Sequence, residues 1–173
     1  MVVEPHSDDA WLSLGQHLLD WQAGGEETAI VTVYGTARRM EESRTYANYV
    51  GAKHLALAIP EGGFAELPSG ILEQAIGEAD MIIGPLGIKH PEHLAVAAAM
   101  PAEALHYVDL PYALKQANAE ATSHRIHQLR VVSWKPRSAK ANAASSIFKS
   151  QSKFWHYNRE DLIGAVEVIV APL

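Results

Sequence analysis

The run AIVTVY at residues 29–34 consists of apolar and β-branched side chains and stops at Gly35. Such a run is typical of a strand that is buried on both faces of a sheet. Similar runs occur before and after it, at residues 1–4, 54–59, 79–84, 104–108, 130–134 and 165–171. Helical patterns fit between these runs, at residues 9–21, 38–50, 69–77, 91–100 and 140–156.

The alternation of buried strands with helices indicates how the chain is layered. Continuous apolar strands that are separated by helices favour a mostly parallel sheet covered on both faces. We therefore expect an α/β fold of the Rossmann-like kind, with three layers in the order α/β/α. In such sheets a binding site forms where the carboxyl ends of the strands meet the loops.

Length and composition restrict the class of protein. The chain has 173 residues and is 48% hydrophobic, which suits one domain with a real core. It has no Cys, which excludes disulfides and thiolate ligands, so any metal must be held by His, Asp or Glu. It has no apolar run near the ~18 residues of a membrane helix and no secretory signal pattern. We expect a cytoplasmic protein with no membrane partner.

The net charge of −6 is unevenly distributed along the chain. Residues 1–114 contain 5 Lys and Arg against 16 Asp and Glu, whereas residues 115–173 contain 9 against 4. The basic last third could contact an anionic substrate or partner, or it could simply be solvated surface. Nucleic acid is not the expected partner, but the composition leaves it open.

The motif PHSDD at residues 5–9 lies between the first predicted strand and the first predicted helix. Imidazole and carboxylate groups are suitable ligands for a divalent metal such as zinc. One of the adjacent carboxylates, Asp8 and Asp9, could bind the metal while the other acts as a base. The alternative is structural, because Ser7, Asp8 or Asp9 could cap the helix that begins here.

The motif HPEH at residues 90–93 opens another predicted helix after a predicted strand. His90 and His93 are three residues apart, so both side chains can face one point. Alone this pattern is weak, but His6, Asp9 and His93 together would form a three-ligand site with an open position for water. That arrangement is typical of a catalytic zinc rather than a structural one. His17, by contrast, is expected on a surface or a helix face.

The two motifs resemble the signatures of the PIG-L/LmbE family of zinc-dependent N-deacetylases. PHSDDA at residues 5–10 matches the family pattern (A/P)HxDD(E/A), and HPEH matches HxDH, with Glu92 where Asp is usual. Weaker matches follow in the order of the family, namely RRME at 38–41, LAIPEG at 57–62, PLG at 85–87, DLPY at 109–112 and SQ at 150–151. The resemblance implies that residues 1–173 form a single deacetylase domain.

The resemblance also implies a role for each residue of the two motifs. His6, Asp9 and His93 would bind one Zn²⁺ per chain, although the same nitrogen and oxygen ligands could hold another divalent metal. Asp8 would be the general base for a metal-bound water. A protonated His90 would stabilise the oxyanion or protonate the leaving amine.

Contacts to the substrate are predicted from polar residues near the ends of strands. The candidates are Arg38, Arg39, Glu61, Asp109 and Tyr112. A solvated helix face is the alternative for the two arginines, and a structural turn or loop for the other three. Ser150 and Gln151 are expected either to form a subunit contact or to close the pocket, and a homo-oligomer stays open.

Three functions are consistent with these residues. The first is zinc-dependent hydrolysis of an N-acyl amide, with acetyl as the expected acyl group, on a small molecule such as an amino sugar or sugar conjugate. The second is deacylation of an acylated amine that is linked to a phosphate, a nucleotide or a nucleic acid. The third is a non-catalytic metal-binding protein of the same fold, against which the presence of Asp8 and His90 argues.

Overall fold

The computed structural model describes residues 1–62, 67–68, 70–152 and 165–173. In this part of the chain, seven strands form one sheet in the order β3-β2-β1-β4-β5-β7-β6. The first five pair in parallel, whereas β7 runs antiparallel to both of its neighbours. The strands are β1 (Val2–Glu4), β2 (Ala29–Tyr34), β3 (Lys53–Ile59), β4 (Ile83–Pro85), β5 (Leu105–Tyr107), β6 (Leu129–Pro136) and β7 (Val166–Pro172).

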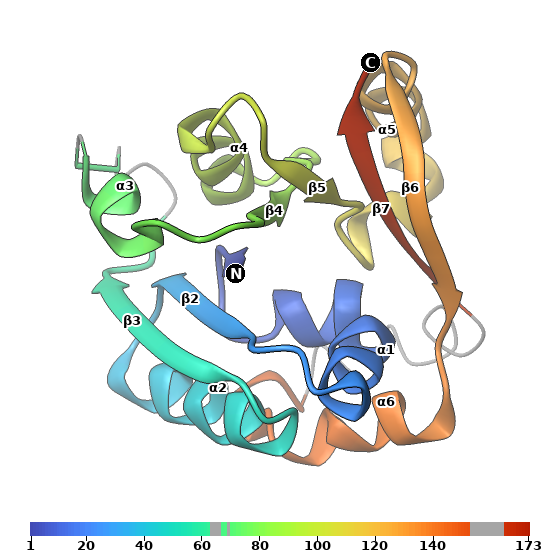
Figure 1. Ribbon diagram of the computed structural model, residues 1–173. Coiled ribbons are helices and arrows are strands. Elements are labelled where there is room, and N and C mark those ends of the chain that lie inside the picture. Colours follow the sequence, from blue (N-terminus) through green and yellow to red (C-terminus); the bar gives the residue numbers. More distant parts are fainter. Residues whose placement is uncertain (63–66, 69, 153–164) are drawn as a thin grey trace.

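Helices cover both faces of the sheet (Figure 1). One face packs against α1 (Asp9–Gly24), α2 (Ala37–Tyr49) and α6 (Ala139–Ala143), and the other against α3 (Ile71–Ile76), α4 (Pro91–Ala99) and α5 (Ala119–Ile126). Successive strand residues point to opposite faces, so Val2 belongs to the first core and Val3 to the second. The predicted three-layer α/β/α fold is confirmed. No helix of the described residues is long and apolar enough to span a bilayer.

The order of the strands reverses direction at the pair β1–β4. From β1 the chain adds β2 and β3 on one side, and from β4 it adds β5 on the other. The loops after β1 and β4 therefore leave the sheet on either side of a crevice, which is where open α/β sheets bind their ligands. Both sequence motifs, residues 5–9 and 90–93, lie in these two loops and at the helix starts that follow.

Three elements differ from the predicted ones. β4 begins at Ile83 rather than at residue 79, because its partners in β1 and β5 begin only at Val2 and Leu105. α5 was not predicted, and its sequence AEATSHRI has no buried residue whose spacing would reveal a helix. The helix predicted over 140–156 is broken at Phe148, which has non-helical backbone angles and stacks on Trp11. The part of this helix beyond residue 152 lies outside the described residues.

A buried ionic cluster connects the antiparallel strands β6 and β7 to α1. His17 is buried rather than exposed, with Nδ1 3.0 Å from Glu167 Oε2 and Nε2 3.0 Å from Ser133 Oγ. Glu167 also accepts a hydrogen bond from Arg137 Nη1 at 2.9 Å and from the backbone N–H of Gln16 at 2.8 Å. Since Glu167 and Arg137 are both inaccessible to solvent at their side chains, each compensates the charge of the other.

Replacing Glu167 with Gln is expected to reduce the free energy of unfolding by about 3 kcal/mol, because the buried Arg137 loses its counter-charge. The matched control is Asp20→Asn, which breaks the partly exposed ion pair between Asp20 and Lys135, a residue near the end of β6 and two positions before Arg137. That loss is expected to stay below about 1 kcal/mol. Urea unfolding monitored by circular dichroism measures both. Equal losses in the two variants would contradict the assignment of Glu167 as a buried counter-ion.

Candidate metal centre

The loop after β1 places three acidic or imidazole side chains at the start of α1. Asp9 Oδ2 accepts a hydrogen bond from the backbone N–H of His6 at 2.8 Å, which closes the loop on itself. Asp8 occupies the N-cap position, but its side chain makes no capping hydrogen bond. Glu4 Oε2 accepts from the backbone N–H of Ala10 instead, at 3.0 Å. Helix capping therefore does not account for Asp8, whose carboxylate faces a cavity.

Glu4 is a buried support for this loop that the sequence reasoning missed. Its Oε1 accepts hydrogen bonds from Thr32 Oγ1 on β2 and Ser43 Oγ on α2, both at 2.6 Å. Burial raises the pKa of Glu4 to about 8. The available signal was a charged residue at the end of an otherwise apolar strand, where an acid is found only if the fold provides partners for it.

His6, Asp9 and His93 meet at the crevice between β1 and β4, and all three are buried. Asp9 Oδ2 lies 3.3 Å from His6 Nδ1 and 3.2 Å from His93 Nε2. Two ligands that are each about 2.0–2.1 Å from a tetrahedral metal lie about 3.3 Å apart. The spacing of these three groups therefore fits a single divalent ion.

The hydrogen bonding of His93 supports the same conclusion. Its Nδ1 lies 2.5 Å from Asp109 Oδ1, whereas its buried Nε2 has no hydrogen-bond partner of suitable geometry among the described residues. A buried polar atom without a partner is costly, so an orphan nitrogen that points at a carboxylate indicates a ligand position. The donor set of two imidazoles and one carboxylate suits zinc, and also iron or cobalt.

Asp109 lies behind His93 rather than in the wall of the cavity. It is fully buried, and its second oxygen accepts from the backbone N–H of Gly87 at 2.9 Å. Gly87 has φ +78°, and a Cβ there would lie 2.8 Å from the Cβ of Ala97, so glycine is required at this turn. Asp109 was predicted to contact the substrate, but its position favours a role in holding His93.

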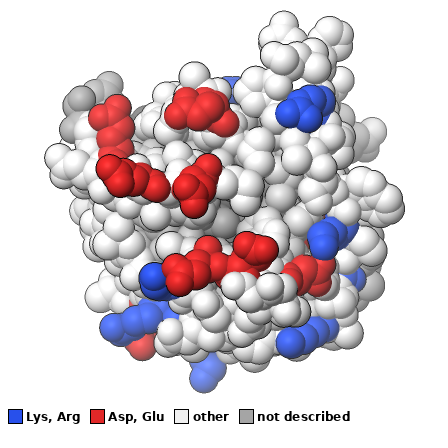
Figure 2. Space-filling view, in the orientation of Figure 1, with Lys and Arg blue, Asp and Glu red and all other residues white. Residues whose placement is uncertain are grey.

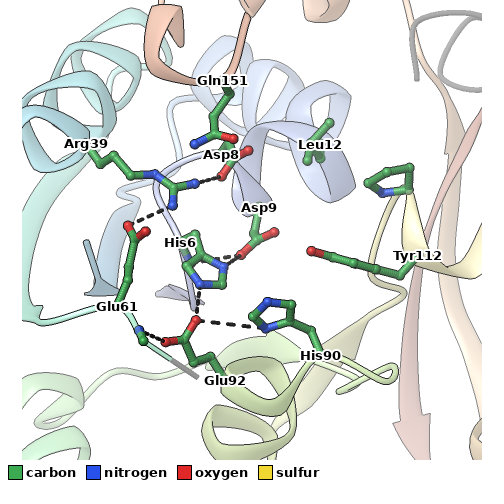
Figure 3. A pocket seen from close by; sticks show the side chains of 12 residues that line it. His6, Asp8, Asp9, Leu12, Arg39, Glu61, His90, Glu92, Tyr112 and Gln151 are labelled. Atoms are coloured by element: carbon green, nitrogen blue, oxygen red, sulfur yellow. Dashed lines mark hydrogen bonds and ion pairs between the residues drawn. The ribbon is translucent and has the colours of Figure 1, made fainter. Parts of the chain in front are cut away.

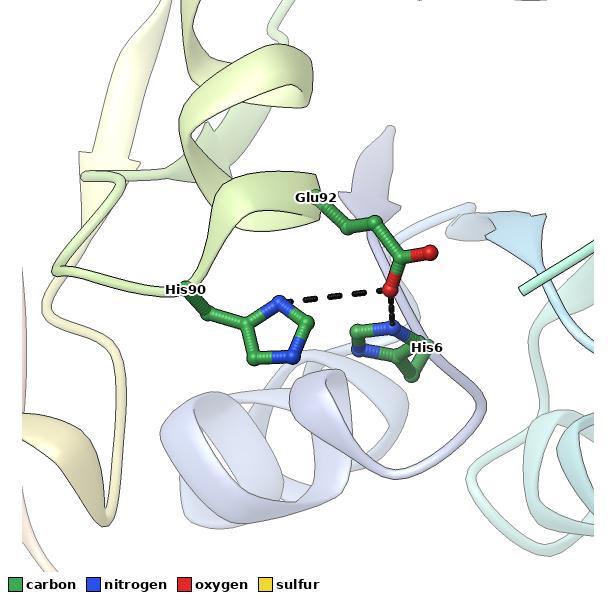
Figure 4. A group of neighbouring side chains, drawn as sticks. All are labelled: His6, His90 and Glu92. Carbon is green, nitrogen blue, oxygen red and sulfur yellow. Dashed lines mark hydrogen bonds and ion pairs between the residues drawn. The ribbon is translucent and has the colours of Figure 1, made fainter. Parts of the chain in front are cut away.

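Glu92 joins the centre from the first turn of α4, although the sequence reasoning gave it no role. Its Oε2 lies 2.6 Å from His6 Nε2 and 3.9 Å from His90 Nδ1. His6, His90 and Glu92 form a second group that could hold a cation, and it shares His6 with the first (Figure 4). The spacing of 2.6 Å is that of a hydrogen bond, so we interpret Glu92 as a support for His6 rather than as a ligand.

A cavity of about 460 Å³ opens above these residues (Figure 3). Of the predicted substrate contacts, Arg39, Glu61 and Tyr112 line it. Arg38 does not, because its side chain is 67% exposed and pairs with Glu42 on the helix surface. The full lining consists of His6, Asp8, Asp9, Leu12, Arg39, Glu61, Gly62, His90, Glu92, Pro111, Tyr112 and Gln151.

The guanidinium of Arg39, in the wall of the cavity, contacts the side chains of three other lining residues. Its Nη2 donates to Asp8 Oδ1 at 3.2 Å, and its Nη1 lies 2.7 Å from Glu61 Oε1. The side-chain oxygen of Gln151, in the amide orientation that satisfies both groups, accepts from Arg39 Nε at 3.2 Å and Nη2 at 2.8 Å. Ser150 donates its backbone N–H to Glu42 Oε1 at 2.8 Å. The segment that contains Ser150 and Gln151 thus closes one side of the cavity.

The pKa values of the two adjacent aspartates, Asp8 and Asp9, shift in opposite directions. Burial and the adjacent Asp9 charge raise the pKa of Asp8 to about 6, against the lowering effect of Arg39. Burial alone would raise the pKa of Asp9, but the neighbouring His93 and His6 lower it below its usual range. Asp9 thus stays ionised as a ligand must, while Asp8 has the pKa of a base that works near neutrality.

The surroundings of His90 disfavour the protonated form of its imidazole. Burial, followed by the charges of His93 and His6, lowers the pKa of its imidazole. The sequence reasoning assumed a protonated His90 that would face the oxyanion. A neutral imidazole still provides one N–H donor, so His90 can donate a hydrogen bond in either protonation state.

The acid limb of the activity profile is expected to move to higher pH in Arg39→Met. The predicted role of Asp8 as a base requires its ionised form, so activity would fall as the pH decreases through its pKa. The Arg39 guanidinium lowers that pKa, and its loss raises it. Initial rates of kcat/KM between pH 5 and 9 measure the shift, with Arg38→Met as the matched control. An unchanged acid limb in Arg39→Met would show that Asp8 does not govern it.

Comparisons with known proteins support the fold but not a family. The sequence matches no family model and no curated protein. The zinc-inhibited form of teicoplanin deacetylase Orf2 is similar with a TM-score of 0.66 at 17% identity, over 99% of this chain and 97% of that one. N,N'-diacetylchitobiose deacetylase from Pyrococcus horikoshii has a TM-score of 0.55 at 14% identity, over 99% and 82%.

Proteins with different activities share this fold. GalB, the 4-carboxy-2-hydroxymuconate hydratase from Pseudomonas putida KT2440, has a TM-score of 0.66 at 14% identity, over 98% of this chain and 94% of that one. Since all these identities are low, the likeness shows the fold alone, and function has to be argued from the site.

Proposed function

We propose that this chain is a metal-dependent N-deacetylase that hydrolyses an N-acyl amide on a small molecule such as an amino sugar. The observation that carries the proposal is the convergence of His6, Asp9 and His93 directly beside Asp8, where His6, Asp8 and Asp9 line an open cavity. A structural metal site has no need of a neighbouring carboxylate with a pKa near 6. The deacetylases among the solved structures of the same fold add weight to it.

His6, Asp9 and His93 are the residues that would hold the metal. A divalent ion held there would supply two effects: an amide carbonyl would be polarised, and a water molecule would become acidic enough to lose a proton near pH 7. Asp8 Oδ2 takes that proton, while Oδ1 stays hydrogen-bonded to Arg39. His90, from the opposite wall of the crevice, donates its N–H to the oxygen on which negative charge develops. The deprotonated water adds to the carbonyl carbon, and the C–N bond breaks as Asp8 returns the proton to the departing nitrogen, which leaves a free amine and a carboxylic acid.

The cavity favours a neutral substrate over a phosphorylated one. Among the described residues that line it, Arg39 is the cation, and Asp8, Glu61 and Gln151 already accept its hydrogen bonds. No described Lys or Arg of the basic last third lines the cavity. Asp and Glu side chains also gather around the middle of the face shown in Figure 2, while Lys and Arg lie mainly toward its lower and right-hand sides. These charges disfavour a nucleotide or nucleic acid substrate.

Metal content and acetate release test the proposal together. The protein is purified without added metal, analysed for metals, and then incubated with N-acetylglucosamine or N,N'-diacetylchitobiose in the presence of zinc. About one metal per chain and release of acetate from either sugar are the expected results. A protein that takes up one metal but cleaves neither sugar would overturn the amino-sugar assignment, whereas one that takes up no metal would overturn the hydrolase assignment itself.

A further inference from the structure

One face of the β6–β7 pair is only partly covered by a helix. Antiparallel pairing places Trp134 opposite Val168 and Val131 opposite Val170. Since alternate residues of a strand share a face, these side chains lie with Val166 on the side of the sheet that α5 covers. Even so, Val131, Trp134 and Val166 are 57%, 64% and 40% exposed, and we call these three side chains the β6–β7 strip (Figure 1). Neighbouring exposed apolar side chains of this kind indicate a contact surface.

The backbone of β6 is poorly suited to pairing with a further strand, although β6 lies at the edge of the sheet. Its register with β7 shifts between Val131 and Ser133, which places a bulge at Val132, and Pro136 has no N–H to donate. Bulges and prolines are features that prevent strand addition at sheet edges. The exposed side chains of the strip, rather than the backbone, are therefore the groups available for a contact.

The exposed charges beside the strip are positive. Arg130 is exposed on β6, and Lys135 pairs with Asp20 of α1. The one acidic residue of the two strands, Glu167, is inaccessible to solvent. In Figure 2 the end of the molecule that carries β6 and β7 shows Lys and Arg among uncharged residues, whereas Asp and Glu gather toward the middle and the left. A surface that complements the strip would be apolar with an acidic border.

A second cavity, of about 570 Å³, provides an apolar surface at the opposite end of the sheet from the metal centre. The first residues of β1 and β4, Val2 and Ile83, line it and are buried, so the cavity opens at the amino ends of the central strands. Trp21 and Met81 also line it, and Met81 is 46% exposed. Its volume is in the range of cavities that bind small molecules, so it has room for a large side chain.

The border of this second cavity is acidic. Exposed carboxylates surround it, among them Glu26, Glu27 and Glu78. The positive groups in the same lining are Lys53, whose Nζ lies 3.5 Å from Glu27 Oε2, and the ammonium of Met1, which donates to a backbone carbonyl. The second cavity thus combines the apolar lining and the negative charge that would complement the strip and Arg130.

We propose that a second copy of this chain covers the β6–β7 strip, with Trp134 seated in the second cavity of that copy and Arg130 facing its acidic border. The contact is head-to-tail, because it joins two different surfaces, and each chain can therefore bind one neighbour through the strip and another through the cavity. Neither surface includes a residue of the metal centre, so the inference does not depend on the proposed function.

Sedimentation velocity of the wild type and of single variants tests the contact. The wild type is expected to exceed the 18.8 kDa of one chain, and added salt is expected to reduce its mass. Trp134→Ser and Met81→Lys should each sediment as one chain, because each removes one of the two surfaces. Both side chains are exposed, and circular dichroism verifies the fold. The control is Leu55→Ser on β3, an exposed apolar residue outside both surfaces, which should assemble like the wild type.

An equal mixture of Trp134→Ser and Met81→Lys tests whether the contact is head-to-tail. The intact cavity of the first variant can receive the intact strip of the second, so a dimer with one chain of each and nothing larger is expected. A mixture that stayed monomeric would show that the strip pairs with a copy of itself, and would overturn the head-to-tail contact. Wild-type assembly in Trp134→Ser would remove the strip from the interface. A wild type of 18.8 kDa would assign the strip to another occupant, such as a lipid surface or an unrelated protein, and overturn the proposal.

Discussion

Asp8→Asn is expected to lower kcat/KM for amide hydrolysis by roughly 10²–10⁴-fold while the protein keeps its metal. Asn has the shape of Asp and can still accept the hydrogen bond from Arg39, but it cannot take a proton from water. The side chain of Asp8 makes no capping hydrogen bond to α1, and Glu4 accepts from the backbone N–H of Ala10 in the first turn. The substitution therefore removes the base without removing a structural contact of the helix.

The measurement combines two readouts on the same preparations. Acetate release from N-acetylglucosamine gives kcat/KM, and elemental analysis gives the metal per chain. Asp80→Asn serves as the control, because Asp80 is exposed near the amino ends of the strands, in the wall of a separate cavity. If Asp8→Asn retained wild-type turnover, another group would have to be the base. If it lost its metal as well, Asp8 would be a ligand.

His93→Ala is expected to lose both the bound metal and the activity. His93 is one of the three proposed ligands, and its removal would leave His6 and Asp9 with too few donors for a closed or a catalytic zinc site. It also leaves Asp109 buried without the imidazole that it accepts from. Activity is expected to fall to that of the wild-type protein after treatment with a chelator.

Dialysis followed by elemental analysis measures the retained metal in His93→Ala. The control is His54→Ala, because His54 on β3 belongs to neither group that could hold a metal, and its Nε2 lies 2.9 Å from Thr32 Oγ1. Circular dichroism establishes that both variants are folded. A folded His93→Ala that retained one metal per chain would move the site to His6, His90 and Glu92, the alternative group at the same crevice.

The sheet could be predicted because most of its strands are short runs of mostly apolar residues. The run at residues 29–34 became β2 with the same bounds, and the strands before and after it lie close to their predicted positions. Two helical segments were not predicted correctly, for a physical reason that lies outside their local sequence. α5 presents no buried face from which a period could be read, and the helix predicted over 140–156 is interrupted where Phe148 packs against Trp11. Such tertiary contacts leave no local signal.

For the candidate site, too, the residues within local motifs could be predicted, whereas those that depend on tertiary contacts could not. The motifs at residues 5–9 and 90–93 indicated His6, Asp9 and His93, since ligand chemistry is local and the topology brings both loops to one crevice. The supporting residues Glu4 and Glu92 were missed, and Asp109 was given a different task. Their roles depend on contacts between residues as distant in sequence as Glu92 and His6, which are 86 positions apart. Sequence spacing does not contain that information.

The separation of the ligands along the chain couples metal binding to folding. His6 and Asp9 follow β1, His93 follows β4, and only the assembled sheet brings these segments together. An unfolded chain has no comparable site, so a metal bound by these residues favours the native state by mass action. At a free concentration of 100 times its Kd, that linkage is worth about 2.7 kcal/mol. The ion would then link the segments that follow β1 and β4, at the centre of the sheet. The metal concentration would therefore influence the stability of the fold as well as its chemistry.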